Sequence, residues 1–248
     1  MKLRHFLPLA SLLCLAACTR RPALPQLGTL CIDTLLSRNG TSCQVDYRFA
    51  TIRNASDSPA LETIEQANIG YFFQLEAFFG TAEKGAEAAL NDILTNYLPE
   101  GSGPGGAEYE ISAESEISVV DSLLCCVITR AGYTGGAHGM YGTECHTYSL
   151  TDGFELSLAD LLTAGEMERL GGLIRREIER QYDAPTDEAL TRAGFFPEYI
   201  LPTENFRITP DGFVFCYNPY EIGCYALGSV EVAISRAMLD DEEDPGNE

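Results

Sequence analysis

Residues 108–119 alternate between apolar and polar side chains, and this pattern sets the strongest limit on what the chain can fold into. Successive side chains of a β-strand point to opposite faces, so the pattern predicts a strand with one buried and one solvated face. Such strands are typical of sheets that are covered on one side only. The apolar set is Tyr109, Ile111, Ala113, Ile117 and Val119, and the polar set is Glu108, Glu110, Ser112, Glu114, Glu116 and Ser118.

Further strands and helices follow from the same periodicities. Strands are expected at residues 45–52, 119–129, 143–150, 205–209, 213–217 and 230–234. Helices are expected at 59–79, 82–97 and 166–182, with shorter ones after Ser157 and at 188–192. The pattern predicts an α+β fold, a mainly antiparallel sheet with helices packed on one face. The glycine-rich run 101–106 suggests a division into two sublobes.

The N-terminus predicts a lipoprotein signal. Lys2 and Arg4 precede an apolar run at 6–15 that is too short to span a bilayer comfortably, and Leu15-Ala-Ala-Cys18 follows. This is the pattern of a bacterial lipobox, in which the peptidase cuts before the cysteine and the sulfur carries a diacylglycerol. The alternative is an ordinary secretory signal cut near Ala17. With two or more acyl chains on Cys18, the protein would be stably anchored to a membrane.

These features divide the chain into five expected segments. They are a signal peptide at 1–17, a tether at 18–28, an N-terminal α+β region at 29–128, a C-terminal region at 129–239 and an acidic disordered tail at 240–248.

The charge of the chain bears on its partners. The signal contains two of the 16 basic residues and none of the 37 acidic ones, so the remainder carries a formal charge of −23. A surface this acidic disfavours nucleic acid and anionic lipid head groups. It favours a cationic partner, or serves solubility alone.

Seven cysteines follow Cys18, and outside the cytoplasm such a set can form disulfides. Cys31 with Cys43 and Cys216 with Cys224 are the nearest pairs in sequence, but spacing does not fix the connectivity. The odd count leaves at least one free thiol. No Cys-x-x-Cys spacing occurs, which argues against a zinc ribbon or thioredoxin chemistry.

Two loops hold the candidate ligand-binding or structural residues. The first is Tyr133-Thr-Gly-Gly-Ala-His-Gly139, where Gly135 and Gly136 permit positive φ and His138 can bond backbone carbonyls. The second contains Tyr217 and Tyr220 around Asn218-Pro219. These tyrosines could contact a glycan or protein, or serve core packing and backbone bonding. If the loops meet in space, a binding role gains support.

No catalytic residues, metal site or cofactor are expected. Cys145 and His146 would point to opposite faces of a strand, so with His138 they do not form a set of zinc ligands. No Gly-x-Ser-x-Gly motif is present. The alternative is a cell-wall hydrolase or a metal-dependent enzyme centred on His138.

The chain resembles the RsiV-like family, a domain of unknown function numbered 3298. The resemblance lies in Tyr133 to Gly139, Tyr148-Ser-Leu-Thr-Asp-Gly153, Leu156-Ser-Leu-Ala-Asp160 and Phe206 to Gly228, and covers roughly residues 130–239. Residues 45–128 resemble, more weakly, the companion domain numbered 4163 of PdaC-type peptidoglycan deacetylases.

The resemblance implies an extracytoplasmic α+β domain found in envelope lipoproteins, in deacetylases as a non-catalytic module, and in an anti-sigma factor that senses lysozyme by binding it. No deacetylase domain, sigma-binding segment or transmembrane helix is recognised here. We therefore expect a non-enzymatic cell-envelope protein, at the periplasmic side of the outer membrane, that binds a cationic lysozyme-like protein or a peptidoglycan glycan. A role as accessory module of an envelope complex is the other alternative.

Overall fold

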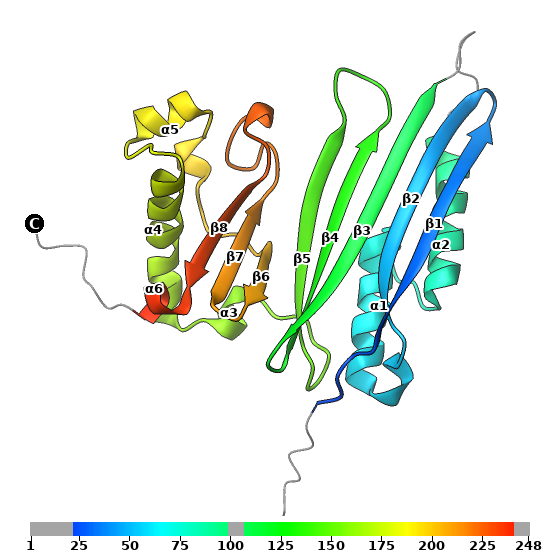
Figure 1. Ribbon diagram of the computed structural model, residues 1–248, viewed down its shortest axis with the longest axis horizontal. Helices are drawn as coiled ribbons and strands as arrows, with labels where there is room; N and C mark the ends of the chain where they lie inside the picture. Colours follow the sequence, from blue (N-terminus) through cyan, green and yellow to red (C-terminus); the bar gives the residue numbers. More distant parts are fainter. Residues whose placement is uncertain (1–21, 99–106, 241–248) are drawn as a thin grey trace, which may run out of the picture.

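The structure is a computed structural model that describes residues 22–98 and 107–240, and two sheets lie next to each other along its long axis (Figure 1). Three features expected from the sequence lie outside the described residues. These are Cys18 with its signal, the glycine-rich run 101–106, and the acidic tail beyond Asp240.

The first sheet has five strands in the order in which they occur along the chain. They are β1 (Leu27–Arg38), β2 (Thr41–Ile52), β3 (Glu108–Val120), β4 (Leu123–Tyr133) and β5 (Met140–Ser149). Neighbouring strands are antiparallel except β2 and β3, which are parallel. A parallel pair needs a crossover connection, and the helical segment between β2 and β3 supplies it.

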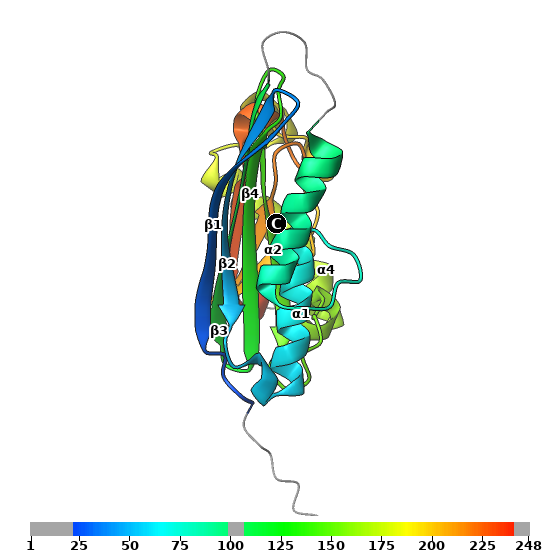
Figure 2. The ribbon, with the colours of Figure 1, turned by 90° about the vertical axis from the view of Figure 1, so that its right-hand side faces the viewer.

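Two helices cover one face of this sheet, and the opposite face of β1–β3 carries no helix (Figure 2). They are α1 (Pro59–Phe73) and α2 (Ala82–Asp92), the latter continued by a π-helical turn at Ile93–Tyr97; a 3-10 turn at Ala55–Asp57 precedes α1. The layer between helices and sheet is a core in which Phe49, Phe72 and Phe73 pack together. The alternation over 108–119 therefore separates a helix-facing side of β3 from a solvated acidic side.

The second sheet is antiparallel and belongs to a separate core. Its strands are β6 (Phe206–Thr209), β7 (Gly212–Tyr217) and β8 (Val230–Ser235), in that order. The helices of this part are α3 (Leu158–Leu161), α4 (Ala164–Gln181), α5 (Asp187–Ala193) and α6 (Arg236–Asp240), with 3-10 turns at Pro197–Tyr199 and Tyr225–Leu227. Strand β7 is buried on both faces. Phe213, Phe215 and Tyr217 face the helices, whereas Val214 and Cys216 face the first sheet.

The change from one core to the other comes between Leu150 and Leu158. The division expected between residues 128 and 129 falls within β4, which is part of the first sheet. Strands β4 and β5 thus pair with the N-terminal strands, and the C-terminal unit begins with α3.

The expected α+β class and mainly antiparallel sheet are confirmed. Several boundaries differ. The strand expected at 119–129 is interrupted by the turn at residues 121–122, which separates β3 from β4. Strand β1 includes residues expected to form a tether or no regular structure. Helix α1 ends at Phe73 instead of near Gly80, because Gln74 adopts the left-handed conformation (φ 55°) that ends a helix.

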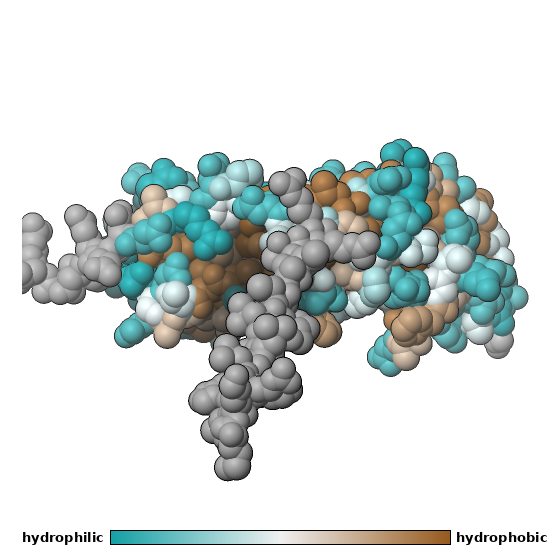
Figure 3. Space-filling view, turned by 90° about the horizontal axis from the view of Figure 1, so that it is seen from below, coloured by the Kyte–Doolittle hydropathy of each residue, from teal (hydrophilic) through white to brown (hydrophobic). Residues whose placement is uncertain are grey.

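None of the helices within 22–98 and 107–240 is both long and apolar enough to cross a membrane. Seen from below, hydrophilic residues cover much of the outer rim, and hydrophobic residues lie in recesses between them (Figure 3).

Candidate functional site

The two loops singled out in the sequence meet in the structure, through a residue that belongs to neither. The ring of His138 stacks on that of Tyr225, with centroids 4.0 Å apart. The Tyr225 hydroxyl donates to the Gly139 carbonyl at 2.8 Å, and the ring of Tyr220 lies 5.6 Å from that of Tyr225. The hairpin loop between β4 and β5 is therefore held against the segment that follows β7.

The glycines and Tyr133 shape the first loop. Gly135 and Gly136 have φ values of 94° and 104°, in the region that side chains with a Cβ rarely adopt. The Tyr133 hydroxyl donates to the Gly136 carbonyl at 3.1 Å across the turn. These residues give the loop its form.

The two tyrosines of the second loop have different surroundings. Tyr217 is buried in the second core, and its hydroxyl donates to the Leu201 carbonyl at 2.6 Å. Burial raises the pKa of Tyr217, so the phenol stays neutral. Tyr220 is 53 % exposed and has a φ of 75°, an unusual backbone conformation for an aromatic residue. Only Tyr220 is thus available to a ligand.

His138 has the surroundings of a loop residue. Its ring is exposed, and Nδ1 lies 2.8 Å from the Gly139 carbonyl oxygen. No bond or ion pair between His138 and a carboxylate is found in the described parts of the chain. Those parts also contain no group of three or more His, Cys, Asp and Glu side chains placed to hold a metal. The arrangement of a histidine base oriented by a carboxylate, as in Ser-His-Asp hydrolases, is not found around His138 among the described residues.

The cysteine pairs suggested by sequence proximity are not bonded. Cys31 is opposite Arg48 and Cys43 is opposite Leu36 in the β1–β2 ladder, which places the two cysteines five positions apart and on opposite faces. Cys216 does not pair with Cys224 either. Its sulfur lies 3.7 Å from that of Cys145 on β5. Proximity in sequence misleads here because strand pairing decides which side chains meet.

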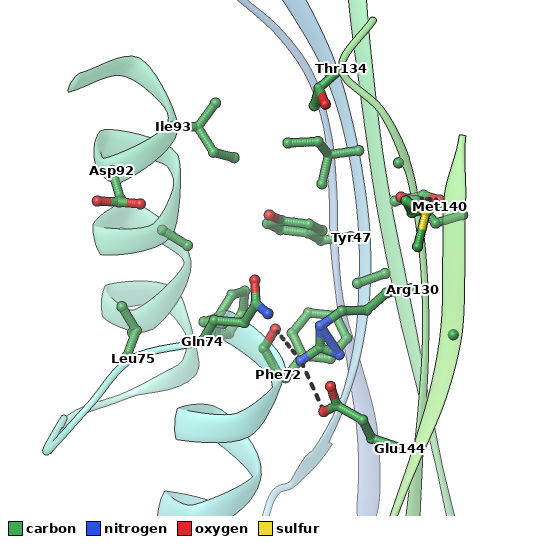
Figure 4. Close-up of a pocket in the computed structure, with 18 of the residues that line it drawn as sticks. Tyr47, Phe72, Gln74, Leu75, Asp92, Ile93, Arg130, Thr134, Met140 and Glu144 are labelled. Carbon is green, nitrogen blue, oxygen red and sulfur yellow. Dashed lines mark hydrogen bonds and ion pairs between the residues drawn. The ribbon is translucent and has the colours of Figure 1, made fainter. Parts of the chain in front are cut away.

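A groove lies between α1, α2 and the helix-facing side of the first sheet. It has a volume of about 800 Å³, within the range of small-molecule sites. Ile93 lines it from the helical side, and Tyr47 and Arg130 from the strands (Figure 4). Tyr141, which also contacts the Tyr225 ring, connects the groove to the aromatic loop cluster. The remaining polar lining includes the amides of Gln74, Asn91, Asn96 and Asn218.

Among the described residues, Arg130 is the one cation that lines this groove. Its Nη2 donates to the carbonyls of Tyr71 and, at 3.3 Å, Phe72, and lies 3.6 Å from Glu144 Oε2 (Figure 4). The guanidinium thereby satisfies carbonyls at the C-terminal end of α1, where a positive charge is favourable. Burial lowers the pKa of Arg130, and Glu144 opposes this effect. Nη1 is buried and has no hydrogen-bond partner among the described residues.

A second polar cluster continues from Glu144. His146 Nδ1 lies 2.7 Å from Glu155 Oε1, and its Nε2 lies 3.9 Å from Glu144 Oε2. The ring of Tyr71 stacks on His146 at 3.8 Å, and its hydroxyl donates to Glu155 Oε2 at 2.8 Å. Residues of α1, β5 and the β5–α3 connection are thereby joined.

The electrostatics of this cluster favour a charged histidine. Burial disfavours the imidazolium, but Glu144 and Glu155 outweigh it and raise the pKa of His146. Despite partial burial, the bonds and charges of His146 and Tyr71 lower the pKa of Glu155. Burial and Glu155 raise the pKa of Tyr71 to about 12. Two carboxylates that favour the charged form of His146 fit a structural ion pair.

Sequence reasoning did not identify Arg130, Glu144, Glu155 or Tyr225. Each of these residues contacts a partner that is far away in the sequence. Glu155, for example, accepts a hydrogen bond from Tyr71. The available signal was the alternation of β5, which places Glu144 and His146 on the face that carries Tyr148 and looks toward α1.

Residues 159–237, from α3 into α6, match a family described as "Protein of unknown function (DUF3298)". This region is shorter than the resemblance inferred from motifs and excludes the loop at Tyr133–Gly139. No curated protein matches the chain.

Two solved structures share the fold over most of the chain. A DUF3298 family member from Bacteroides fragilis has a TM-score of 0.76 at 24% identity, covering 89% of this chain and 94% of that one. A DUF3298 family protein from Pseudomonas aeruginosa has a TM-score of 0.63 at 18% identity, covering 88% and 94%. At these identities the likeness is one of fold. The chain therefore carries a DUF3298 domain at residues 159–237, packed against a five-stranded sheet with two helices.

Proposed function

We propose that this is a lipid-anchored, non-enzymatic protein of the bacterial cell envelope that binds a peptidoglycan fragment in the groove beside Arg130. The observation that carries the proposal is Nη1 of Arg130, which is buried beside a groove of about 800 Å³ and has no hydrogen-bond partner among residues 22–98 and 107–240. An unpaired N–H of this kind is costly, and a carboxylate would satisfy it with a charge-assisted hydrogen bond. The peptide stems of peptidoglycan end in carboxylates.

The rest of the lining suits the sugar part of such a ligand. Tyr47 and Tyr141 offer aromatic surface, and the amide of Asn91 offers a donor and an acceptor for hydroxyl and acetamido groups. The aromatic cluster of His138, Tyr220 and Tyr225 extends this surface beyond Tyr141. A ligand with a chain of sugar rings could therefore contact both regions.

The location of the protein rests on its N-terminus. Lipidation at Cys18 would hold the domain at a membrane, where cell-wall fragments occur. The periplasmic side of the outer membrane is the location that we favour.

Calorimetric titration of the protein lacking residues 1–18 with a soluble disaccharide-peptide tests the proposal. We expect saturable binding that weakens about 10- to 100-fold in Arg130→Gln, the loss expected for a hydrogen bond to a charged group. The same sugar without its peptide should bind more weakly than the full fragment. Tyr141→Ala, at a 40 % exposed side chain, should weaken sugar binding without affecting the end of α1.

Arg48→Gln is the matched control, because Arg48 is exposed on β2 and does not line the groove. Its affinity should equal that of the unaltered protein. Melting curves of Arg130→Gln exclude unfolding as the cause of a loss. Equal affinity of Arg130→Gln and the unaltered protein, or no binding of any fragment, would contradict the proposal.

A cationic, lysozyme-like protein is the second candidate ligand, and a separate observation favours it. The face of β2 and β3 that is opposite to the helices exposes five carboxylates and one cation, Arg48. The carboxylates are those of Asp46, Glu108, Glu110, Glu114 and Glu116. Such a face would attract a basic protein in a salt-dependent manner. Capture of lysozyme at low salt that is lost at high salt, and in a variant with these carboxylates changed to amides, would support this candidate.

A hydrolase or metal-dependent enzyme centred on His138 has less support from the geometry. The ring stacks on Tyr225 and bonds a backbone oxygen. An accessory role in an envelope complex is compatible with either ligand.

A further inference from the structure

Three buried cysteines gather where the two sheets meet. Cys145 on β5 and Cys216 on β7 are 71 residues apart in sequence, yet their sulfurs lie 3.7 Å apart. Cys125 on the adjacent β4 is also buried here, its sulfur accepting from the Thr147 hydroxyl at 3.8 Å. The Cys145–Cys216 pair is the one described pair of cysteines with a sulfur–sulfur contact.

The backbones of this pair are held in place by a single residue. Asn205 Oδ1 accepts from the Cys145 amide at 2.9 Å, and Asn205 Nδ2 donates to the Cys216 carbonyl at 2.9 Å. The Cys216 amide in turn donates to the Asn205 carbonyl at 2.8 Å. The two strands therefore cannot separate at the cysteines without breaking these bonds. A disulfide requires the two sulfurs to approach from 3.7 Å to about 2 Å.

We propose that Cys145 and Cys216 form a disulfide that covalently joins the DUF3298 domain to the five-stranded sheet. Formation removes two protons and two electrons from the two thiols. The oxidant is a disulfide, either of a thiol-oxidising protein or of a small molecule such as oxidised glutathione, and it is reduced to two thiols. The inference relies on the extracytoplasmic location proposed above only for the supply of this oxidant.

The exchange has two steps. One of the two cysteines attacks the oxidant as its thiolate, releases one thiolate and forms a mixed disulfide. The other cysteine, on losing its proton, attacks the sulfur of the first and releases the second thiolate. Both sulfurs are buried, so the first attack requires that β7 has not yet docked on β5.

The test uses the full-length protein expressed in a bacterial envelope. Free thiols are alkylated under denaturing, non-reducing conditions, and the digest is analysed by mass spectrometry. We expect a linked peptide containing Cys145 and Cys216, with Cys31 alkylated. Alkylation of both Cys145 and Cys216, or a link from either to Cys125 or Cys224, would overturn the assignment.

A second measurement does not depend on the compartment. Purified protein is unfolded, refolded with oxidised glutathione, and melted with and without dithiothreitol. A bond that closes a loop of this length should raise the Tm by about 10 °C in the oxidised form. Cys145→Ala should abolish this difference, whereas Cys31→Ser, at an exposed position on β1, should keep it. If the link forms after refolding but not in cells, the proposed extracytoplasmic location is wrong. If it forms in neither case, the proposed disulfide is wrong.

Discussion

The side chain of Asn205 binds the backbone amide of Cys145 on β5, the edge strand of the first sheet. Oδ1 accepts from the Cys145 amide, and Nδ2 donates to the carbonyls of Thr143, at 2.8 Å, and Cys216. Asn218 repeats the arrangement, accepting from the Thr143 amide at 2.7 Å. Two carboxamides thus take the place of a sixth strand, because each offers a donor and an acceptor as a backbone does. This covers the edge of the sheet and joins it to the C-terminal domain.

Asn205→Ala should lower the free energy of unfolding by about 2–4 kcal/mol. Three hydrogen bonds are lost, and partly buried backbone groups are left without partners. Urea denaturation monitored by circular dichroism measures the change. Asn91→Ala, at an exposed side chain on α2, is the control and should change stability by less than about 0.5 kcal/mol. A change of that small size in Asn205→Ala would show that the carboxamide does not hold the sheets together.

Gly153→Ala should destabilise the protein more than Gly40→Ala does. Both glycines have positive φ, 82° and 85°, so each substitution introduces backbone strain of about 1–2 kcal/mol. At Gly153 an added Cβ would also lie 2.7 Å from the Ala60 carbonyl oxygen of α1, whereas at Gly40 nothing lies within 4 Å. We expect a total loss of about 2–4 kcal/mol at Gly153. Equal losses in thermal melts would mean that the turn does not press against α1.

The contribution of His146 to stability should decrease with rising pH. Because the pKa of His146 is raised in the folded state, its stabilisation is complete below the unfolded pKa of about 6.5 and is lost as pH rises through the higher folded value. The pKa values of Glu144 and Glu155 are lowered in the folded state, so the stabilisation that these two carboxylates contribute is complete only above the unfolded pKa of about 4.3. The difference in free energy of unfolding between the unaltered protein and His146→Gln should therefore be greatest near pH 5.5.

Urea titrations at pH 5.5, 7 and 9 measure this difference. Glu155→Gln should cost much less in the His146→Gln background than alone, because the two residues form one ion pair. A pH-independent difference, or additive losses, would rule out the charged pair.

Cys18→Ala should abolish the incorporation of labelled palmitate and release the protein from the membrane fraction. A lipobox cysteine is the acyl acceptor, and without acyl chains no stable anchor remains. Cys14→Ala, four residues earlier in the same segment, is the control and should keep the label. Retention of the label in Cys18→Ala would show that the lipobox interpretation is wrong.

Several local features follow from short stretches of sequence. The alternation over 108–119 predicted β3 and its solvated acidic face, and Ser58-Pro59 marked the start of α1. Ser157 and Asp160 form the capping box that their spacing suggests. The two faces of β7 are divided between two cores as the alternation of Phe213, Phe215 and Tyr217 indicates. These patterns succeed because periodicity and capping depend on residues at most a few positions apart.

The features that depend on distant partners could not be read in this way. Helix α1 ends where Gln74 turns left-handed and the guanidinium of Arg130, from β4, binds the last carbonyls. Cys216 lies beside Cys145 instead of Cys224 because β7 docks on β5. The groove is formed by two helices that lie over four strands, and Arg130 lines it only because of this packing. Periodicity and capping act within a few residues, and they determined the class and the elements of the fold. The positions of the side chains in the site depend on strand pairing and helix docking, because these join residues that are far apart in the chain.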